Sequence, residues 1–225
     1  MFKQAPLLWI VLMLSMFCII FVLNFIPVIG SLLIVLLTPV FDVGMLAFAK
    51  GQTDNGNADI TRFFTGFQNK TGALIGAGAL YWVMLLVATV IVAILAFIVI
   101  GSSAIGGPAS AFSGQAVAQM MANGMGLGLL LIFLVAIALM LLVTSAYWFA
   151  PALIAYANLS VMDAFRESFK AVWRNWLSLF VYGLLLTLMC IVAAIPFGLG
   201  LLVAAPVLMA SNYPCFRDIF GRRPA

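Results

Sequence analysis

Residues 36–51, LLTPVFDVGMLAFAKG, decide the fold, because they read as the second half of a membrane helix that ends at Lys50. The run contains two residues that stand out in an apolar helix, Pro39 and Asp42. A proline inside a helix removes a backbone hydrogen bond and bends the helix. A carboxylate is costly in lipid unless it is paired. Pro39 therefore concerns how the protein is built, and Asp42 is a candidate functional residue.

The whole chain shares this apolar character: 66% of its 225 residues are hydrophobic and 7% are charged. A soluble domain of this size has no interior large enough to bury so much apolar surface. The apolar runs are long and unbroken, unlike the alternating pattern of barrel strands. The sequence therefore predicts an all-α, polytopic membrane protein.

Six apolar runs are long enough to cross a bilayer, near 6–26, 31–49, 73–100, 126–149 (or 126–157), 176–195 and 199–214. We predict one transmembrane domain, 1–225, that consists of three helical hairpins at about 5–50, 73–157 and 176–215. Short turns close the first and third hairpins, and a Gly/Ser/Ala-rich outer loop at 101–125 closes the middle one.

The ten basic residues all lie at the chain ends or between the predicted hairpins, and the turns inside the hairpins carry no charge. Lys and Arg are retained on the cytoplasmic side of membranes, so both termini are predicted to be cytoplasmic. Topology explains these few cations, and we expect no nucleic acid partner despite the net charge of +4.

Two connectors, at about 59–71 and 160–175, are predicted to be amphipathic helices at the membrane interface. In the second, Arg166, Lys170 and Arg174 recur every four residues, beside Trp173 and Trp176. Such a stripe meets anionic headgroups while the aromatic rings lie at the headgroup boundary. We predict membrane lipids as partners at the cytoplasmic face. The alternatives are helices that only anchor the bundle, or a docking surface for a protein partner or a second copy.

The proline of the first hairpin recurs. Pro39, Pro151 and Pro206 each precede the first charge beyond their helix by 11 or 12 residues. This predicts three bent helices and a parallel pseudo-threefold repeat about the membrane normal. The bends form either a vestibule open to the cytoplasm or simple packing bends. Asp42 does not recur, because its counterparts are Ile154 and Met209.

Two segments carry a resemblance, FAPALIAYANLSVMDAFRESFKAVWRNWLSLFVYGLL (149–185) and GLGLLVAAPVLMASNYPCFRDIF (198–220). Their features are a proline after an aromatic, the pattern S-x-x-x-A-[FL]-[RK]-x-[ST]-[FW], a Gly-rich turn and Phe-Arg-Asp at 216–218. They are similar to uncharacterised bacterial six-helix inner-membrane families, related to the membrane domain fused to some glycerophosphodiester phosphodiesterases. The resemblance implies this fold and location and no catalytic residues. It departs in the long outer loop, and the amphipathic leader that it implies is expected to be cut short at Met1.

The chain offers little catalytic chemistry. It has no histidine, and Cys18, Cys190 and Cys215 lack CxxC spacing, which removes the commonest general base and the usual metal-ligand patterns. Asp42 is the one carboxylate of six inside a predicted span. We therefore predict that the protein is not an enzyme and holds no metal or cofactor.

Asp42 lies about 12 Å of helix from Lys50, and Arg62, Arg166 or Arg174 is expected to pair with it. Asp42 is either a lock between the first hairpin and a connector, or a cation site, proton site or gate.

Two function classes follow from the sequence. The first is a lipid- or partner-interacting protein of envelope homeostasis. The alternative is a small-solute or ion transporter or channel, with a vestibule around the prolines and Asp42. The few polar residues in the spans favour the first.

Overall fold

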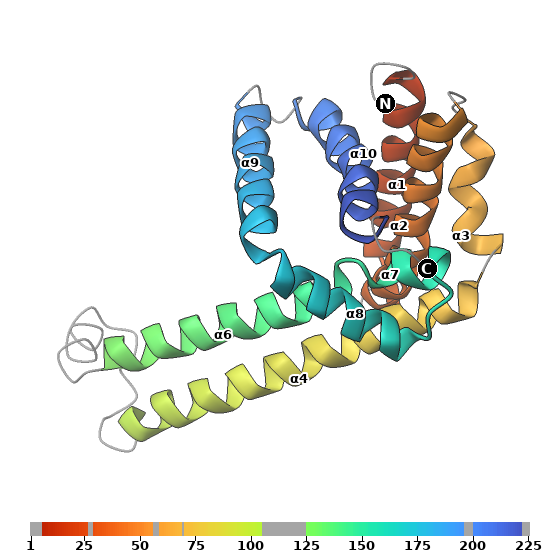
Figure 1. Ribbon diagram of the computed structural model, residues 1–225. Helices are drawn as coiled ribbons and strands as arrows, with labels where there is room; N and C mark the ends of the chain where they lie inside the picture. Colours follow the sequence, from red (N-terminus) through yellow and green to blue (C-terminus); the bar gives the residue numbers. More distant parts are fainter. Residues whose placement is uncertain are drawn as a thin grey trace. The chain divides into compact units, whose positions relative to one another are not determined.

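The computed structural model describes residues 6–26, 29–55, 59–68, 70–104, 125–195 and 200–221, and within them every regular element is a helix (Figure 1). The helices are α1 (Pro6–Asn24), α2 (Ile29–Asn55), the 3₁₀ helix η2 (Ile60–Phe64), α3 (Thr65–Gln68), α4 (Thr71–Ala104), α6 (Met125–Tyr147), α7 (Ala150–Tyr156), α8 (Val161–Arg174), α9 (Trp176–Ala194) and α10 (Leu201–Phe220). Most of the predicted outer loop, 101–125, lies outside the described residues.

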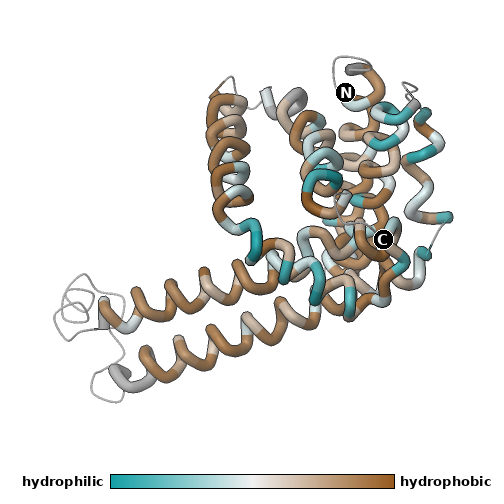
Figure 2. Tube along the Cα trace, in the orientation of Figure 1, coloured by the Kyte–Doolittle hydropathy of each residue, from teal (hydrophilic) through white to brown (hydrophobic). Residues whose placement is uncertain are grey.

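Five stretches are long and apolar enough to cross a membrane: Leu7–Asn24, Ile29–Asp54, Thr71–Val99, Gly126–Tyr156 and Trp176–Ala194. Figure 2 shows α4, α6 and α9 hydrophobic along most of their length, whereas hydrophilic residues gather on α8. The predicted all-α fold is thus confirmed for the described residues, with five stretches that could span a membrane. The sixth predicted span, 199–214, falls on α10, which is helical but is not among the five.

The chain divides into two compact units. One comprises Met1–Leu80 with Ser145–Ala225, and the other comprises Tyr81–Thr144. The second unit consists of the distal parts of α4 and α6. Within it, a Cβ built on Gly128 would lie 2.9 Å from a methyl carbon of Val99, so glycine permits this close approach of the two helices.

The core of the first unit lies among α1, α2 and α10. Trp9 and Phe48 pack edge to face with ring centroids 4.9 Å apart, and both are fully buried. The Trp9 indole N–H donates to Oε1 of the buried Gln52 at 2.9 Å. In the most apolar stretch of α2, 56% is buried inside the protein, whereas none of the corresponding stretch of α9 is buried. The bare apolar surface of α9 is what a lipid-facing helix requires.

The connector after α2 differs from the single predicted amphipathic helix at 59–71, because it forms the two short helices η2 and α3. Asp59 caps η2 by accepting hydrogen bonds from the Thr61 hydroxyl at 2.7 Å and the Thr61 amide at 2.9 Å, which hold the pKa of Asp59 below its usual range. The connector packs against α2 backbone to backbone. A Cβ on Gly44 would overlap the carbonyl oxygen of Phe63, and one on Gly66 would overlap that of Val40.

The three prolines take two different positions in their helices. Pro39 lies inside α2 and Pro206 inside α10, the position that the prediction of a kink requires. Pro151 instead lies in the first turn of α7, after a break that follows Tyr147. At this break, the hydroxyl of the fully buried Ser168 of α8 accepts from the Phe149 amide at 3.0 Å and donates to the Ser145 carbonyl at 2.9 Å. The hydroxyl thus replaces one backbone bond of a continuous helix, which accounts for the break.

Candidate functional site

Asp42 is paired with a tyrosine rather than with an arginine. The Tyr147 hydroxyl donates to Asp42 Oδ2 at 3.0 Å, and the Tyr147 ring meets Phe165 of α8 edge to face, with centroids 6.3 Å apart. The predicted arginines lie elsewhere, because Arg62 packs beside Gly51 and Arg166 lies 3.9 Å from Asp163. The contact links α2 to the end of α6, and it leaves Asp42 hydrogen-bonded inside the protein.

A groove of about 730 Å³ is lined by α7, by α8 and by the C-terminal parts of α2 and α10. We call it the basic groove. Its lining includes four cations and two carboxylates: Lys50, Arg166, Lys170, Arg217, Asp163 and Glu167. These residues come from three helices that are distant in sequence, so the fold concentrates positive charge at one place.

The cations of the basic groove differ in how they are neutralised. Lys170 Nζ lies 2.9 Å from Glu167 Oε1, and Arg166 forms its weaker pair with Asp163 one turn earlier. Neither Lys50 nor Arg217 forms an ion pair with another described residue. The Lys50 ammonium lies 5.0 Å from the centroid of the Tyr156 ring, a cation–π contact. Two positive charges of the groove are therefore without a carboxylate partner among the described residues.

Aromatic rings form the apolar part of the groove. Tyr156, Tyr213, Phe216 and Phe220 all line it. Phe216 packs against Phe220, with centroids 5.1 Å apart, and against Tyr156 at 6.2 Å. The hydroxyl of Tyr156 is buried and has no hydrogen-bond partner among the described residues. A buried, unsatisfied hydroxyl is unusual in a folded protein.

A cap at its first turn and one buried face hold α8 in position. Ser160 caps the helix by accepting from the Asp163 amide at 3.2 Å. Phe165, Ser168 and Ala171 are buried against the protein. Trp173 and Trp176 stay exposed, at 58% and 60% of their surface. One face of α8 is thus packed on the protein, whereas Trp173 near its end and Trp176 at the start of α9 are left for another apolar surface.

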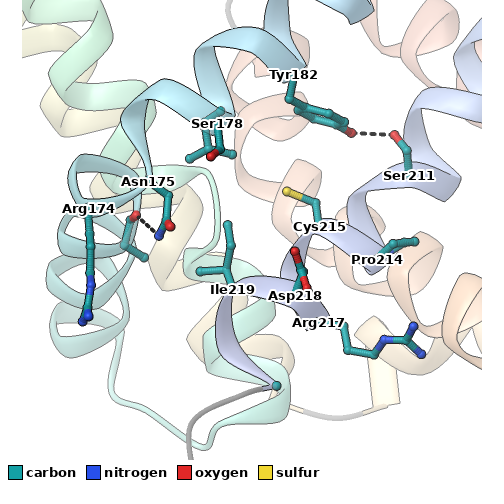
Figure 3. Close-up of a pocket in the computed structure, with 13 residues that line it drawn as sticks. Arg174, Asn175, Ser178, Tyr182, Ser211, Pro214, Cys215, Arg217, Asp218 and Ile219 are labelled. Atoms are coloured by element: carbon teal, nitrogen blue, oxygen red, sulfur yellow. Dashed lines mark hydrogen bonds between the residues drawn. The ribbon is translucent and has the colours of Figure 1, made fainter.

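A second groove, of about 1080 Å³, lies between the α8–α9 junction and α10 (Figure 3). The Tyr182 and Ser211 hydroxyls share a hydrogen bond of 2.5 Å within it. The carboxylate of Asp218 and the thiol of Cys215 point into this groove, whereas the side chains of Arg174 and Arg217 extend away from its middle (Figure 3). This groove has hydroxyl and carboxylate groups at its centre, so it offers an anion less than the basic groove does.

The structure therefore divides the predicted stripe. Arg166 and Lys170 line the basic groove, while Arg174 lines the second groove. From the sequence, Lys50 was assigned to topology, and Arg217 to topology and to the Phe-Arg-Asp motif of the resemblance, while Tyr156 was not predicted for the site. The available signal was that all three stand at the charged ends of apolar helices. Ser168 was also missed, although a serine on the apolar face of an amphipathic helix is a visible anomaly.

These features define the class of the protein, an α-helical membrane protein that carries a basic, aromatic-lined groove at the charged ends of its helices. No family model, curated protein or solved structure matches the chain.

Proposed function

We propose that this is a non-enzymatic protein of the bacterial inner membrane that interacts with anionic lipids at the cytoplasmic face, in a role in envelope homeostasis. The observation that carries the proposal is the basic groove, where cations from α2, α8 and α10 converge beside aromatic residues. Cations next to an apolar wall suit a lipid headgroup, because the phosphate and the adjoining acyl region both find partners.

The proposed topology has six spans in three hairpins, with α10 as the sixth span and both termini cytoplasmic. Lys50 and Arg217 support it, because they lie in the C-terminal parts of α2 and α10 and line the same groove. Pro39, Pro151 and Pro206 are all buried, which favours packing bends over a vestibule. The parallel repeat and the relationship to the six-helix bacterial families remain predictions.

Charge reversal on α8 tests the lipid interaction. We expect Arg166→Glu with Lys170→Glu to reduce the anionic lipid that copurifies with the protein by roughly tenfold or more, since each cation near an anionic surface contributes about 1 kcal/mol. The measurement is the phospholipid content per protein after purification in a mild neutral detergent, by mass spectrometry.

Arg174→Glu is the matched control, because it changes the same stripe outside the basic groove. It is expected to retain most of the lipid. Unchanged lipid content in the double variant would refute the proposal. If the double variant instead lost a copurifying protein, or changed its oligomeric state with its lipid intact, the surface would be a docking site for that partner or for a second copy.

Transport is the second candidate, and the hydrogen bond between Asp42 and Tyr147 is the observation that favours it. An ionisable residue within a span is a functional candidate by default. If transport is the function, we expect Asp42→Asn to abolish solute or proton flux in proteoliposomes. Tyr147→Phe keeps the Asp42 carboxylate and is expected to retain part of the flux. Equal flux in wild type, Asp42→Asn and empty liposomes would end this alternative.

A further inference from the structure

We infer that the basic groove holds the headgroup of one lipid phosphomonoester, and that Lys50 and Arg217 select its second negative charge. The inference rests on the proposed lipid interaction and specifies its headgroup class.

The balance of charge around the groove carries the first step. Four cations face two carboxylates, which leaves a surplus of two positive charges. Asp163 and Glu167 already lie near Arg166 and Lys170. The surplus therefore belongs to Lys50 and Arg217, which approach the groove from α2 and α10. A phosphomonoester carries close to two negative charges at neutral pH, because its second pKa is about 6, whereas a phosphodiester carries one.

The lining also distinguishes a lipid from free phosphate. Leu153, Tyr213, Phe216 and Phe220 line the groove beside its cations. A small hydrated anion gains nothing from such a wall, whereas the glycerol and acyl region of a lipid buries apolar surface against it. Trp173 near the end of α8 and Trp176 at the start of α9 are exposed and suited to the headgroup boundary. The groove thus combines what a membrane-embedded phosphate ester requires.

The unsatisfied hydroxyl of Tyr156 is a further, independent observation. Tyr156 lines the groove beneath Lys50, and its buried hydroxyl has no partner among the described residues. A tyrosine hydroxyl can donate to a phosphate or ester oxygen. A headgroup that entered the groove deeply enough to reach this buried hydroxyl would satisfy it, whereas a lipid adsorbed on the surface of α8 would not.

The test compares short-chain lipids that differ in headgroup charge. The purified full-length chain in a neutral detergent is titrated with dioctanoyl phosphatidic acid, dioctanoyl phosphatidylglycerol and inorganic phosphate, and bound molecules are counted by native mass spectrometry. We expect one saturable molecule of phosphatidic acid, bound about tenfold more tightly than phosphatidylglycerol, as one additional charge-assisted contact implies. Inorganic phosphate is expected to bind far more weakly than either lipid.

The variants locate the effect. Lys50→Gln with Arg217→Gln is expected to bring the two lipids within about twofold of each other, while Arg174→Gln keeps the preference. Lys50→Arg preserves the charge and is expected to keep most of the preference for phosphatidic acid. Such a result shows that a substitution at this position leaves the site folded. Equal binding of both lipids by the wild type overturns the inference but leaves the lipid interaction standing. A preference that survives in the double variant, or phosphate as tight as lipid, also overturns it. Absence of any anionic lipid binding refutes the proposed function as well.

Discussion

Gly44→Ala is expected to lower the free energy of unfolding by about 3 kcal/mol or more. Gly44 lies in the middle of α2, where a Cβ would overlap the carbonyl oxygen of Phe63. That atom belongs to the backbone of η2, so it cannot be relieved by a change of rotamer. The connector would have to leave α2, which would also separate the stacked rings of Phe41 and Phe63, whose centroids are 5.8 Å apart. Unfolding of the purified protein in detergent measures the effect.

Gly183→Ala is the matched control for this prediction. Gly183 also lies inside an apolar helix, α9, but no atom lies within 4 Å of a Cβ built there. Alanine at that position is expected to leave stability unchanged or to raise it by about 0.5–1 kcal/mol. If Gly44→Ala were as stable as Gly183→Ala, the close packing of the connector on α2 would be incorrect.

Ser168→Ala is expected to cost about 2–4 kcal/mol of stability. The substitution removes both hydrogen bonds that the hydroxyl makes at the break between α6 and α7. The buried Phe149 amide loses its acceptor, and the half-buried Ser145 carbonyl loses one donor; an unsatisfied buried group costs about 1–3 kcal/mol. Pro151 provides no amide hydrogen with which to rebuild a continuous helix here. The same detergent unfolding measurement detects the change.

Ser15→Ala separates this effect from the general loss of a serine in a helix. The Ser15 hydroxyl donates to the Leu12 carbonyl at 2.8 Å, within its own helix and on an exposed face. Its removal is expected to change stability by less than about 0.5 kcal/mol. Ser168→Ala with an effect no larger than that of Ser15→Ala would contradict the role of the Ser168 hydroxyl at the break.

Local patterns predicted the helices well. The predicted span 176–195 corresponds to α9 at Trp176–Ala194, and the amphipathic segment 160–175 corresponds to α8 at Val161–Arg174. Both depend on features that can be read within one helix, an apolar run and a periodic face. The break after Tyr147 was not predictable in this way, because it depends on a hydroxyl that arrives from α8. The division of the connector into η2 and α3 likewise accompanies contacts between Gly44, Gly66 and distant backbone atoms.

In the candidate site too, features within one helix were predictable and contacts between distant helices were not. That Arg166 and Lys170 share one face was predictable, since both belong to one helical stripe, and both line the basic groove; their contact with lipid stays a prediction. The convergence of Lys50 and Arg217 on that stripe requires α2, α8 and α10 to meet, which a single sequence does not state. Asp42 was singled out from the sequence, but the arginines predicted as its partners are not the residue that it contacts. Its hydrogen bond to Tyr147 joins positions 105 residues apart and has no local signal.

The most direct test of the account is a high-resolution density map of the protein purified with its native lipids in a nanodisc. We predict phosphate-like density in the basic groove between Lys50, Arg166 and Arg217, continuous with acyl density along the aromatic residues that line the groove. A map with α2, α8 and α10 in place and the groove free of lipid density would contradict it.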